Sequence, residues 1–158
     1  MGWLSRPYKV HIRKSQASDA AAFSGLHAQG FERAWGISEF ESLLCEKAVC
    51  AHMAQTSLNH PCGFIISRVA ADEAEILSVA VAKNARQKGV GGQLLNLHLS
   101  ALAQSGAKAV FLEVDELNLA AIALYKHFGF AIVGTRKAYY KRTDGSSPSA
   151  LVMKRCLK

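Results

Sequence analysis

The feature that most constrains the fold of this chain is a glycine-rich segment, Gln87-Lys88-Gly89-Val90-Gly91-Gly92, placed between a predicted strand and a predicted helix. The strand is Ile76–Val81, and the helix continues to a stop at Gly106. Glycines allow a ligand to approach the backbone closely, and a helix start offers unpaired N–H groups at the positive end of the helix dipole. The segment therefore predicts a site for a phosphate or pyrophosphate, although a plain turn into a helix fits the same residues.

The same segment differs from the two best-known phosphate-binding fingerprints. A Walker loop requires G-x-x-x-x-G-K-[ST], and a dinucleotide site requires G-x-G-x-x-G. Neither pattern occurs here. The pattern present is Arg86-x-x-Gly89-x-Gly91, in which Arg86 and Lys88 add positive charge to the loop.

The apolar periodicity along the chain predicts one mixed α/β domain that covers residues 1–158. Val110–Val114 is a continuous apolar run, typical of a strand buried on both faces, and Asn118 can cap a helix that Gly129 ends. The order predicts antiparallel strands first and a βαβ unit later, in one sheet flanked by helices. The other predicted strands are Tyr8–Arg13, Val49–Ala54, Cys62–Val69, Phe130–Tyr140 and Leu151–Leu157, with Ala71–Glu75 as a connector, and the other helices lie between Ser18 and Gly30 and over Ile37–Cys45.

The charge of the chain is basic and unevenly distributed, with a net charge of +7. From Lys126 onward there are eight basic residues and one acid, Asp144, whereas ten acids outnumber seven bases between Gly30 and Glu116. A basic chain favours anionic partners such as nucleic acid or phosphorylated cofactors, but a solvated basic face explains the same charge. We expect no direct binding of nucleic acid.

The sequence lacks the motifs that would indicate a membrane protein, a secreted protein or a metal-dependent protein. The uncharged stretch Gly89–Ala107 carries a polar stripe at helical spacing and predicts an amphipathic helix, and Met1–Arg6 holds no apolar run of signal-peptide length. The four cysteines lack C-x-x-C spacing, and the six histidines lack H-E-x-x-H. We expect a cytoplasmic protein with free thiols and no metal, while a catalytic cysteine stays open. The cysteines are Cys45, Cys50, Cys62 and Cys156.

The motif Arg86-x-x-Gly89-x-Gly91 resembles the coenzyme-A signature [RQ]-x-x-G-x-[GA] of the GNAT superfamily of N-acetyltransferases. The segment Leu112–Phe130 is similar to the second half of that fold. Within the superfamily the chain is most similar to the RimI type, the ribosomal-protein alanine N-acetyltransferases, which Tyr139-Tyr140, Thr143–Gly145 and Phe31–Trp35 also resemble. The resemblance implies a single GNAT-like domain that transfers an acetyl group from acetyl-CoA to an amine.

The resemblance also implies where acetyl-CoA binds. The backbone of Val79–Val81 would hold the pantetheine arm and polarise the thioester carbonyl, and the glycine-rich loop would bind the pyrophosphate. It implies no metal and no covalent enzyme intermediate. The cofactor-binding residues expected on this basis are Val79, Ala80, Val81, Arg86, Gln87, Lys88, Gly89, Val90, Gly91, Gly92 and Asn118.

Two residues are candidates for proton transfer. Glu113 matches the general base of the family, and an N-terminal α-amine with a pKa of about 7.7–8.0 must lose a proton to attack a thioester. Tyr125 matches the residue that protonates the departing coenzyme-A thiolate. Each has a simpler explanation: Glu113 as a solvated carboxylate at a strand end, Tyr125 as a packed aromatic beside Ile122 and Phe128. Asn118 is likewise an ordinary helix cap as well as a candidate cofactor contact.

The acceptor implied by the resemblance is a protein N-terminus, with a ribosomal protein as the specific expectation. The chain departs from the subfamily pattern at Lys141, which follows the paired tyrosines, and at Ser149. Both positions concern the substrate end of the fold. A small amine or a lysine side chain is the alternative acceptor, and a non-catalytic module that binds ribosomes or nucleic acid on the same fold is the alternative class.

Overall fold

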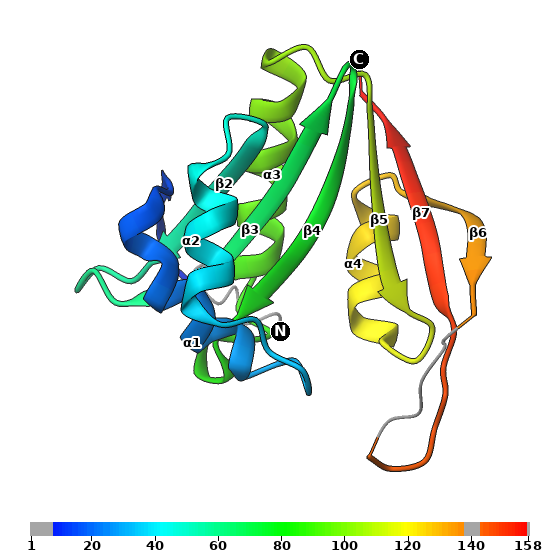
Figure 1. Ribbon diagram of the computed structural model, residues 1–158, viewed down its shortest axis with the longest axis horizontal. Helices are drawn as coiled ribbons and strands as arrows, with labels where there is room; N and C mark the ends of the chain where they lie inside the picture. The colour runs from blue at the N-terminus through cyan, green and yellow to red at the C-terminus, as the bar shows by residue number, and fades with distance from the viewer. Residues whose placement is uncertain (1–7, 138–142, 158) are drawn as a thin grey trace, which may run out of the picture.

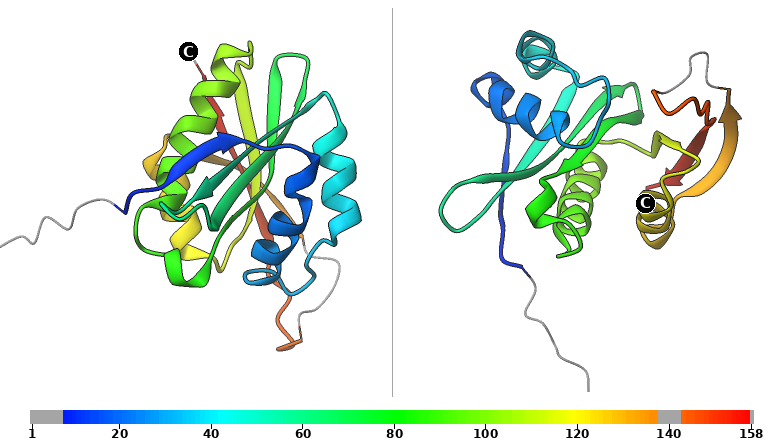
Figure 2. Two further views of the ribbon diagram at one scale, coloured as in Figure 1. Left: turned by 90° about the vertical axis from the view of Figure 1, so that its left-hand side faces the viewer. Right: turned by 90° about the horizontal axis from the view of Figure 1, so that it is seen from below.

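A seven-stranded sheet in the order β1-β2-β3-β4-β5-β7-β6 organises the computed structural model, which describes residues 8–137 and 143–157. Helices α1 and α2 cover one face of the sheet, and α3 and α4 cover the other (Figures 1 and 2). The mixed α/β fold with antiparallel strands first is confirmed. The strands are β1 His11–Lys14, β2 Val49–Gln55, β3 Pro61–Ala70, β4 Glu73–Val81, β5 Ala109–Asp115, β6 Ala131–Arg136 and β7 Ala150–Cys156, and the helices are α1 Ala20–Ala28, α2 Ile37–Cys45, α3 Val90–Gln104 and α4 Leu119–His127.

Strands β4 and β5 run parallel and separate part of the way along their length. Their ladder joins Glu73–Ile76 to Ala109–Leu112 and ends there. At the same point the register between β3 and β4 shifts, so that Ile66 pairs with Ser78 while Ser67 pairs with Ile76. Leu77 is therefore the extra residue of a β-bulge, which bends a strand and increases its twist. Figure 1 shows the two strands meeting at one end and spreading apart toward the other.

The predicted connector Ala71–Glu75 is wrong in its second half. Strand β4 already begins at Glu73, which pairs with Ala70. Exposed Glu73 and Glu75 alternate with buried Ala74 and Ile76, the period-2 pattern of a half-buried strand. The acidic residues Asp72, Glu73 and Glu75 made this segment resemble a polar connector in the sequence.

Strand β5 is buried on one face rather than both, which corrects a second prediction. Val110, Leu112 and Val114 are buried, whereas Glu113 between them is exposed. Helices α1 and α2 pack over β2, β3 and β4, and Figure 2 shows that they do not extend over β5. The open face of β5 therefore presents Glu113 to the gap between the two halves of the sheet.

Helix α3 matches the prediction of an amphipathic helix. Leu94, Leu95, Leu99 and Leu102 are buried against the sheet, while Asn96, Ser100 and Gln104 are exposed. Among the described residues no helix is long and apolar enough to cross a membrane.

Candidate active site

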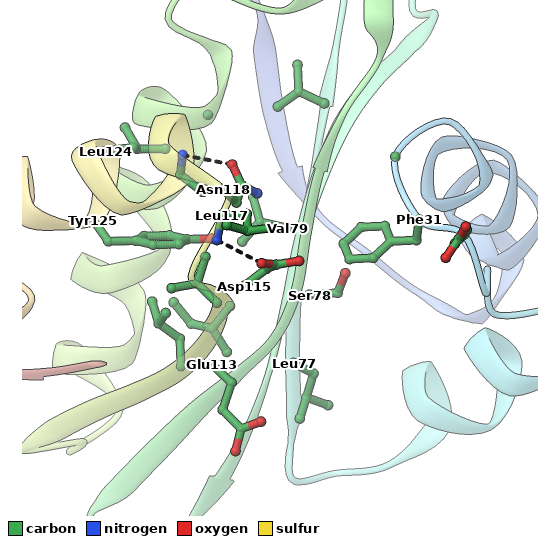
Figure 3. A pocket seen from close by; sticks show the side chains of 18 of the residues that line it. Phe31, Leu77, Ser78, Val79, Glu113, Asp115, Leu117, Asn118, Leu124 and Tyr125 are labelled. Atoms are coloured by element: carbon green, nitrogen blue, oxygen red, sulfur yellow. Dashed lines mark hydrogen bonds between the residues drawn. The ribbon is translucent and has the colours of Figure 1, made fainter. Parts of the chain in front are cut away.

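A cavity of about 630 Å³ occupies the space where β4 and β5 diverge. Its walls come from β4, β5, the start of α3, the length of α4 and two loops that meet at its mouth (Figure 3). Six of the residues predicted from sequence line it: Val79, Val81, Gly91, Glu113, Asn118 and Tyr125.

The edge of β4 presents backbone groups to this cavity. The Ala82 N–H donates to the Cys62 carbonyl at 2.8 Å, and the register pairs Gly63 with Val81 and Ile65 with Val79. Hydrogen-bonded and non-hydrogen-bonded pairs alternate along an antiparallel ladder, so both of these pairs are of the non-hydrogen-bonded kind. The N–H and C=O groups of Val79 and Val81 therefore point away from β3, toward the side from which β5 has diverged. The Val81 carbonyl accepts from Arg86, so an extended ligand could pair there with the N–H and C=O of Val79 and the N–H of Val81, as another strand would.

The glycine-rich loop leads into α3 through two residues of positive φ. Gln87 and Gly89 both have positive φ, 60° and 82°, and α3 begins directly afterwards at Val90. A non-glycine residue at positive φ is uncommon, and such residues concentrate at functional sites. The Gln93 N–H donates to the Gly89 carbonyl at 3.1 Å, so the helix itself provides no acceptor for the N–H groups of Val90, Gly91 and Gly92.

The fold itself does not require glycine at position 91. A Cβ there would lie 3.4 Å from Leu124 and 3.8 Å from Val81, both ordinary contacts. Gly89, in contrast, is required by its positive φ. Close approach of a ligand remains as the physical reason for a glycine at 91.

The basic side chains of this loop have partners within the protein. The Arg86 guanidinium donates through Nε to the Val81 carbonyl at 3.1 Å and through Nη2 to the Gln29 carbonyl at 3.3 Å. The Lys88 ammonium lies 4.9 Å from the centre of the Tyr8 ring. Arg86 thus links the loop to the ends of β4 and α1. A direct contact of Arg86 or Lys88 with acetyl-CoA stays a prediction.

Glu113 extends from the open face of β5 at the lower side of the cavity (Figure 3). Its carboxylate forms an ion pair with Arg136 of β6 at 3.1 Å, across the intervening strand β7. The Arg136 side chain is 65% exposed, and exposed ion pairs contribute only about 0–1 kcal/mol. An incoming amine can therefore displace the guanidinium at small cost. Sequence reasoning missed Arg136, because β7 enters the sheet between β5 and β6.

Tyr125 reaches the cavity from the α4 side. Its ring is buried and packs edge-to-face on Phe130, with the ring centres 5.8 Å apart, and its hydroxyl points across toward Val79 of β4 (Figure 3). Burial raises the pKa of Tyr125 to about 12, so the phenol keeps its proton at any physiological pH. Both readings of Tyr125, as packed ring and as proton donor, are compatible with this position.

Asn118 caps α4, because its side-chain oxygen accepts a hydrogen bond from the Ala121 N–H at 3.2 Å. It also lines the cavity. Ser78, which sequence reasoning missed, lies on the opposite wall beside Phe31 (Figure 3). Its hydroxyl is buried and has no hydrogen-bond partner among the described residues. This hydroxyl could therefore form a hydrogen bond with a ligand in the cavity.

Two loops meet at the mouth of the cavity. The loop after α1 is held by His27, whose Nδ1 accepts from the Trp35 N–H at 3.0 Å and whose ring stacks on Phe31 at 4.0 Å. Burial lowers the pKa of His27, which favours the neutral ring that this bond needs. Glu32 in the same loop accepts hydrogen bonds from the backbone and hydroxyl of Thr143 in the β6–β7 loop. Tyr139, Tyr140 and Lys141 lie outside the described residues.

The model of the acetyltransferase (GNAT) family matches residues 20–130 of this chain. The [ribosomal protein bS18]-alanine N-acetyltransferase of Escherichia coli strain K12 is 30% identical over 142 residues, which cover 90% of this chain and 94% of that protein. The residues matched by the family model include β4, the glycine-rich loop and the start of α3, which contribute to the cavity.

Solved structures give the same fold. The crystal structure of the ribosomal-protein-S18-alanine N-acetyltransferase from Escherichia coli superimposes with a TM-score of 0.88 at 27% identity and covers 95% of both chains. Arabidopsis thaliana NAA60 in complex with acetyl-CoA superimposes with a TM-score of 0.80, covering 94% of this chain and 99% of that one. At 17% identity the second likeness concerns the fold alone.

Proposed function

Because this chain belongs to the acetyltransferase (GNAT) family and transfers acetyl groups from acetyl-CoA to an amine, we propose that its acceptor is the N-terminal α-amine of a protein. The E. coli relatives are named as alanine N-acetyltransferases of the ribosomal protein S18, and a protein of that class is the acceptor we propose here. The observation that carries the proposal is the negative charge of the side chains that line the cavity.

Four acidic side chains line the cavity: Glu32, Glu113, Asp115 and Asp144. They come from three separate segments, the loop after α1, strand β5 and the β6–β7 loop, and three of them belong to the acid-rich part of the sequence between Gly30 and Glu116. A cleft lined by one sign of charge attracts ligands of the opposite sign. A free α-amine is mostly protonated at neutral pH, so it fits this wall better than an uncharged or anionic acceptor does.

In the proposed reaction, acetyl-CoA would bind on the β4 side of the cavity and the amine on the β5 side. The pantetheine arm would pair with the backbone of Val79 and Val81, and the pyrophosphate would lie on the N–H groups at the start of α3. The amine would enter on the open face of β5, give its proton to Glu113 and attack the thioester carbon. Tyr125, on the α4 side, would return a proton to the coenzyme-A sulfur as the C–S bond breaks. Much of the rate gain would come from holding both substrates in one orientation.

The acceptor is tested by competition between two peptides, each with one lysine, of which one has a free and the other a blocked N-terminus. We expect the free peptide to be acetylated at its α-amine and the blocked peptide to react far more slowly. At neutral pH roughly a tenth of an α-amine is uncharged, against far less than a hundredth of a lysine whose pKa is about 10.4. Mass spectrometry of the products locates the acetyl group. Equal rates for the two peptides would instead indicate a lysine or small-amine acceptor.

The cofactor position is tested by Gly91→Val. The new Cβ would make ordinary contacts with Leu124 and Val81, and the added side chain would displace the ligand from the N–H groups of α3. Loss of one hydrogen bond to a charged group costs about 1.5–3 kcal/mol, which corresponds to about 10–100-fold weaker binding. Calorimetric titration with acetyl-CoA measures this.

The matched control for Gly91→Val is Gly25→Val. Gly25 is exposed on α1 and does not line the cavity, and a side chain there would meet nothing within 4 Å. The control should fold and should bind acetyl-CoA like the parent. Unchanged affinity in a folded Gly91→Val protein would place the pyrophosphate elsewhere.

A further inference from the structure

Three side chains that acetyl transfer does not use meet between α3 and the sheet. Cys50 and His52 are two residues apart on β2, so they project from the same face of the strand. His98, fully buried, comes from the middle of α3. One ligand atom from each residue lies within 4.8 Å of the other two. The sequence gives no sign of this cluster, because a C-x-H pair on a strand and a distant helical histidine match no metal-binding motif.

The two imidazoles are held in a geometry that suits metal binding. Nδ1 of His52 lies 2.8 Å from Nδ1 of His98, and Nε2 of His98 lies 2.7 Å from the hydroxyl of Ser67. Ser67 on β3 is opposite Cys50 in the strand register. Histidine ligands in metal sites characteristically donate their other ring N–H to a polar group, which fixes the tautomer and the ring orientation. In the tautomer in which Nε2–H of His98 donates to Ser67, Nδ1 of His98 accepts from Nδ1–H of His52, and the same Nδ1 lone pair is the one that would bind a metal ion.

Metal binding requires neutral imidazoles and a deprotonated thiol. The two Nδ1 atoms of His52 and His98 share one hydrogen, and on metal binding this proton moves to the Nε2 atom of His52, which frees both Nδ1 lone pairs. The S–H bond of Cys50 breaks as the metal–sulfur bond forms, so one proton is released to solvent.

We propose that Cys50, His52 and His98 form a binding site for a divalent ion of the zinc type. One thiolate and two imidazoles are a ligand set typical of Zn²⁺, which takes four ligands in a tetrahedron. With Zn–N bonds of about 2.0–2.1 Å, two nitrogens of the tetrahedron lie about 3.3 Å apart, so the rings need to separate by about half an ångström. Rotation of the half-buried Cys50 side chain brings in the sulfur.

The fourth ligand and the path of entry come from a second cavity. Cys50 and His52 line a cavity of about 450 Å³ that also contacts Lys14, Lys47 and Ser105. A water molecule or a small anion from this cavity can complete the coordination, and the two lysines favour an anion. His98 lies eight residues beyond the first residue of α3, about 12 Å along the helix axis. The site is thus separate from the start of α3, and its existence does not depend on the acceptor proposed above.

Titration of the metal-free protein with Zn²⁺, followed by calorimetry, tests the proposal. We expect one ion per chain and a rise in the melting temperature. Cys50→Ser removes the sulfur ligand with a side chain of similar shape, and Ser67→Ala removes the group that orients His98. Outer-shell substitutions cost about 10–100-fold in metal affinity, so we expect Ser67→Ala in that range and Cys50→Ser at least as large a loss. Acetyl transfer by metal-free Cys50→Ser should match that of the metal-free parent.

Cys45→Ser is the matched control, because Cys45 is an exposed thiol at the end of α2. This variant should bind Zn²⁺ like the parent. Co²⁺ used in place of Zn²⁺ should show a sulfur-to-metal charge-transfer band in the parent and in Cys45→Ser, and this band should disappear in Cys50→Ser. Absence of stoichiometric Zn²⁺ binding, or equal affinities for Cys50→Ser and Cys45→Ser, would reduce the cluster to a hydrogen-bonded histidine pair in the core and overturn the proposal.

Discussion

Replacement of Glu113 by glutamine is expected to lower turnover by about 10²–10⁴-fold, the usual contribution of a general base, with little change in the affinity for acetyl-CoA. Glutamine keeps the size of the side chain and can still accept a hydrogen bond from Arg136, which forms an ion pair with Glu113 in the parent. The proton acceptor is therefore the main thing removed. Steady-state turnover and calorimetry with acetyl-CoA give the two quantities.

The pH dependence separates a base from a structural carboxylate. An α-amine with a pKa of about 7.7–8.0 loses its proton to solvent as the pH rises, so the defect of Glu113→Gln should shrink between pH 7 and pH 9. Arg136→Gln is the matched control: it breaks the same ion pair but leaves the carboxylate, and it should retain most of the activity because an exposed pair contributes about 0–1 kcal/mol. A defect of constant size at every pH would argue against proton transfer by Glu113.

Replacement of Tyr125 by phenylalanine is expected to slow turnover by about 10²-fold, at the lower end of the range for a general acid. A thiol with a pKa of about 8.5 is a moderate leaving group, so it depends less on protonation than an alkoxide does. The ring is retained, and with it the edge-to-face contact with Phe130, so the melting temperature should change little. Turnover and thermal unfolding are the measurements.

The alkaline side of the pH profile gives a second test for Tyr125. Burial raises the pKa of its hydroxyl to about 12, so the parent should show no loss of activity from Tyr125 ionisation up to about pH 10. Tyr125→Phe should be slower than the parent by a similar factor at pH 7 and pH 9. If the phenylalanine variant is as fast as the parent, Tyr125 is only a packing residue.

Local elements were predictable from the sequence because their signals are local. The polar stripe of α3, the stop at Gly106 and the Asn118 cap of α4 each depend on residues within a few positions of one another, and the structure has all three. The glycine-rich loop likewise indicated where α3 would begin.

What could not be predicted depends on long-range register. Nothing near Leu77 signals that β4 bulges and leaves β5 at that point, because the bulge is defined by pairing with β3. The exposure of Glu113 depends on how far α1 and α2 extend over the sheet, and its pairing with Arg136 depends on β7 lying between β5 and β6. The meeting of Cys50, His52 and His98 has the same cause, since 46 positions separate the two histidines.

With the short ladder between β4 and β5, acetyl-CoA bound as proposed would have a mechanical role as well as a chemical one. Glu73–Ile76 and Ala109–Leu112 are the ladder that joins the two strands, and beyond it the sheet is held open. A pantetheine chain bound along Val79 and Val81 would bridge that opening, and any ligand that binds the folded state alone stabilises it by mass action. Binding of acetyl-CoA would then also stabilise the contact between the two halves of the sheet, β1 to β4 and β5 to β7. The supply of acetyl-CoA would set how firmly the acceptor-binding half is coupled to the rest.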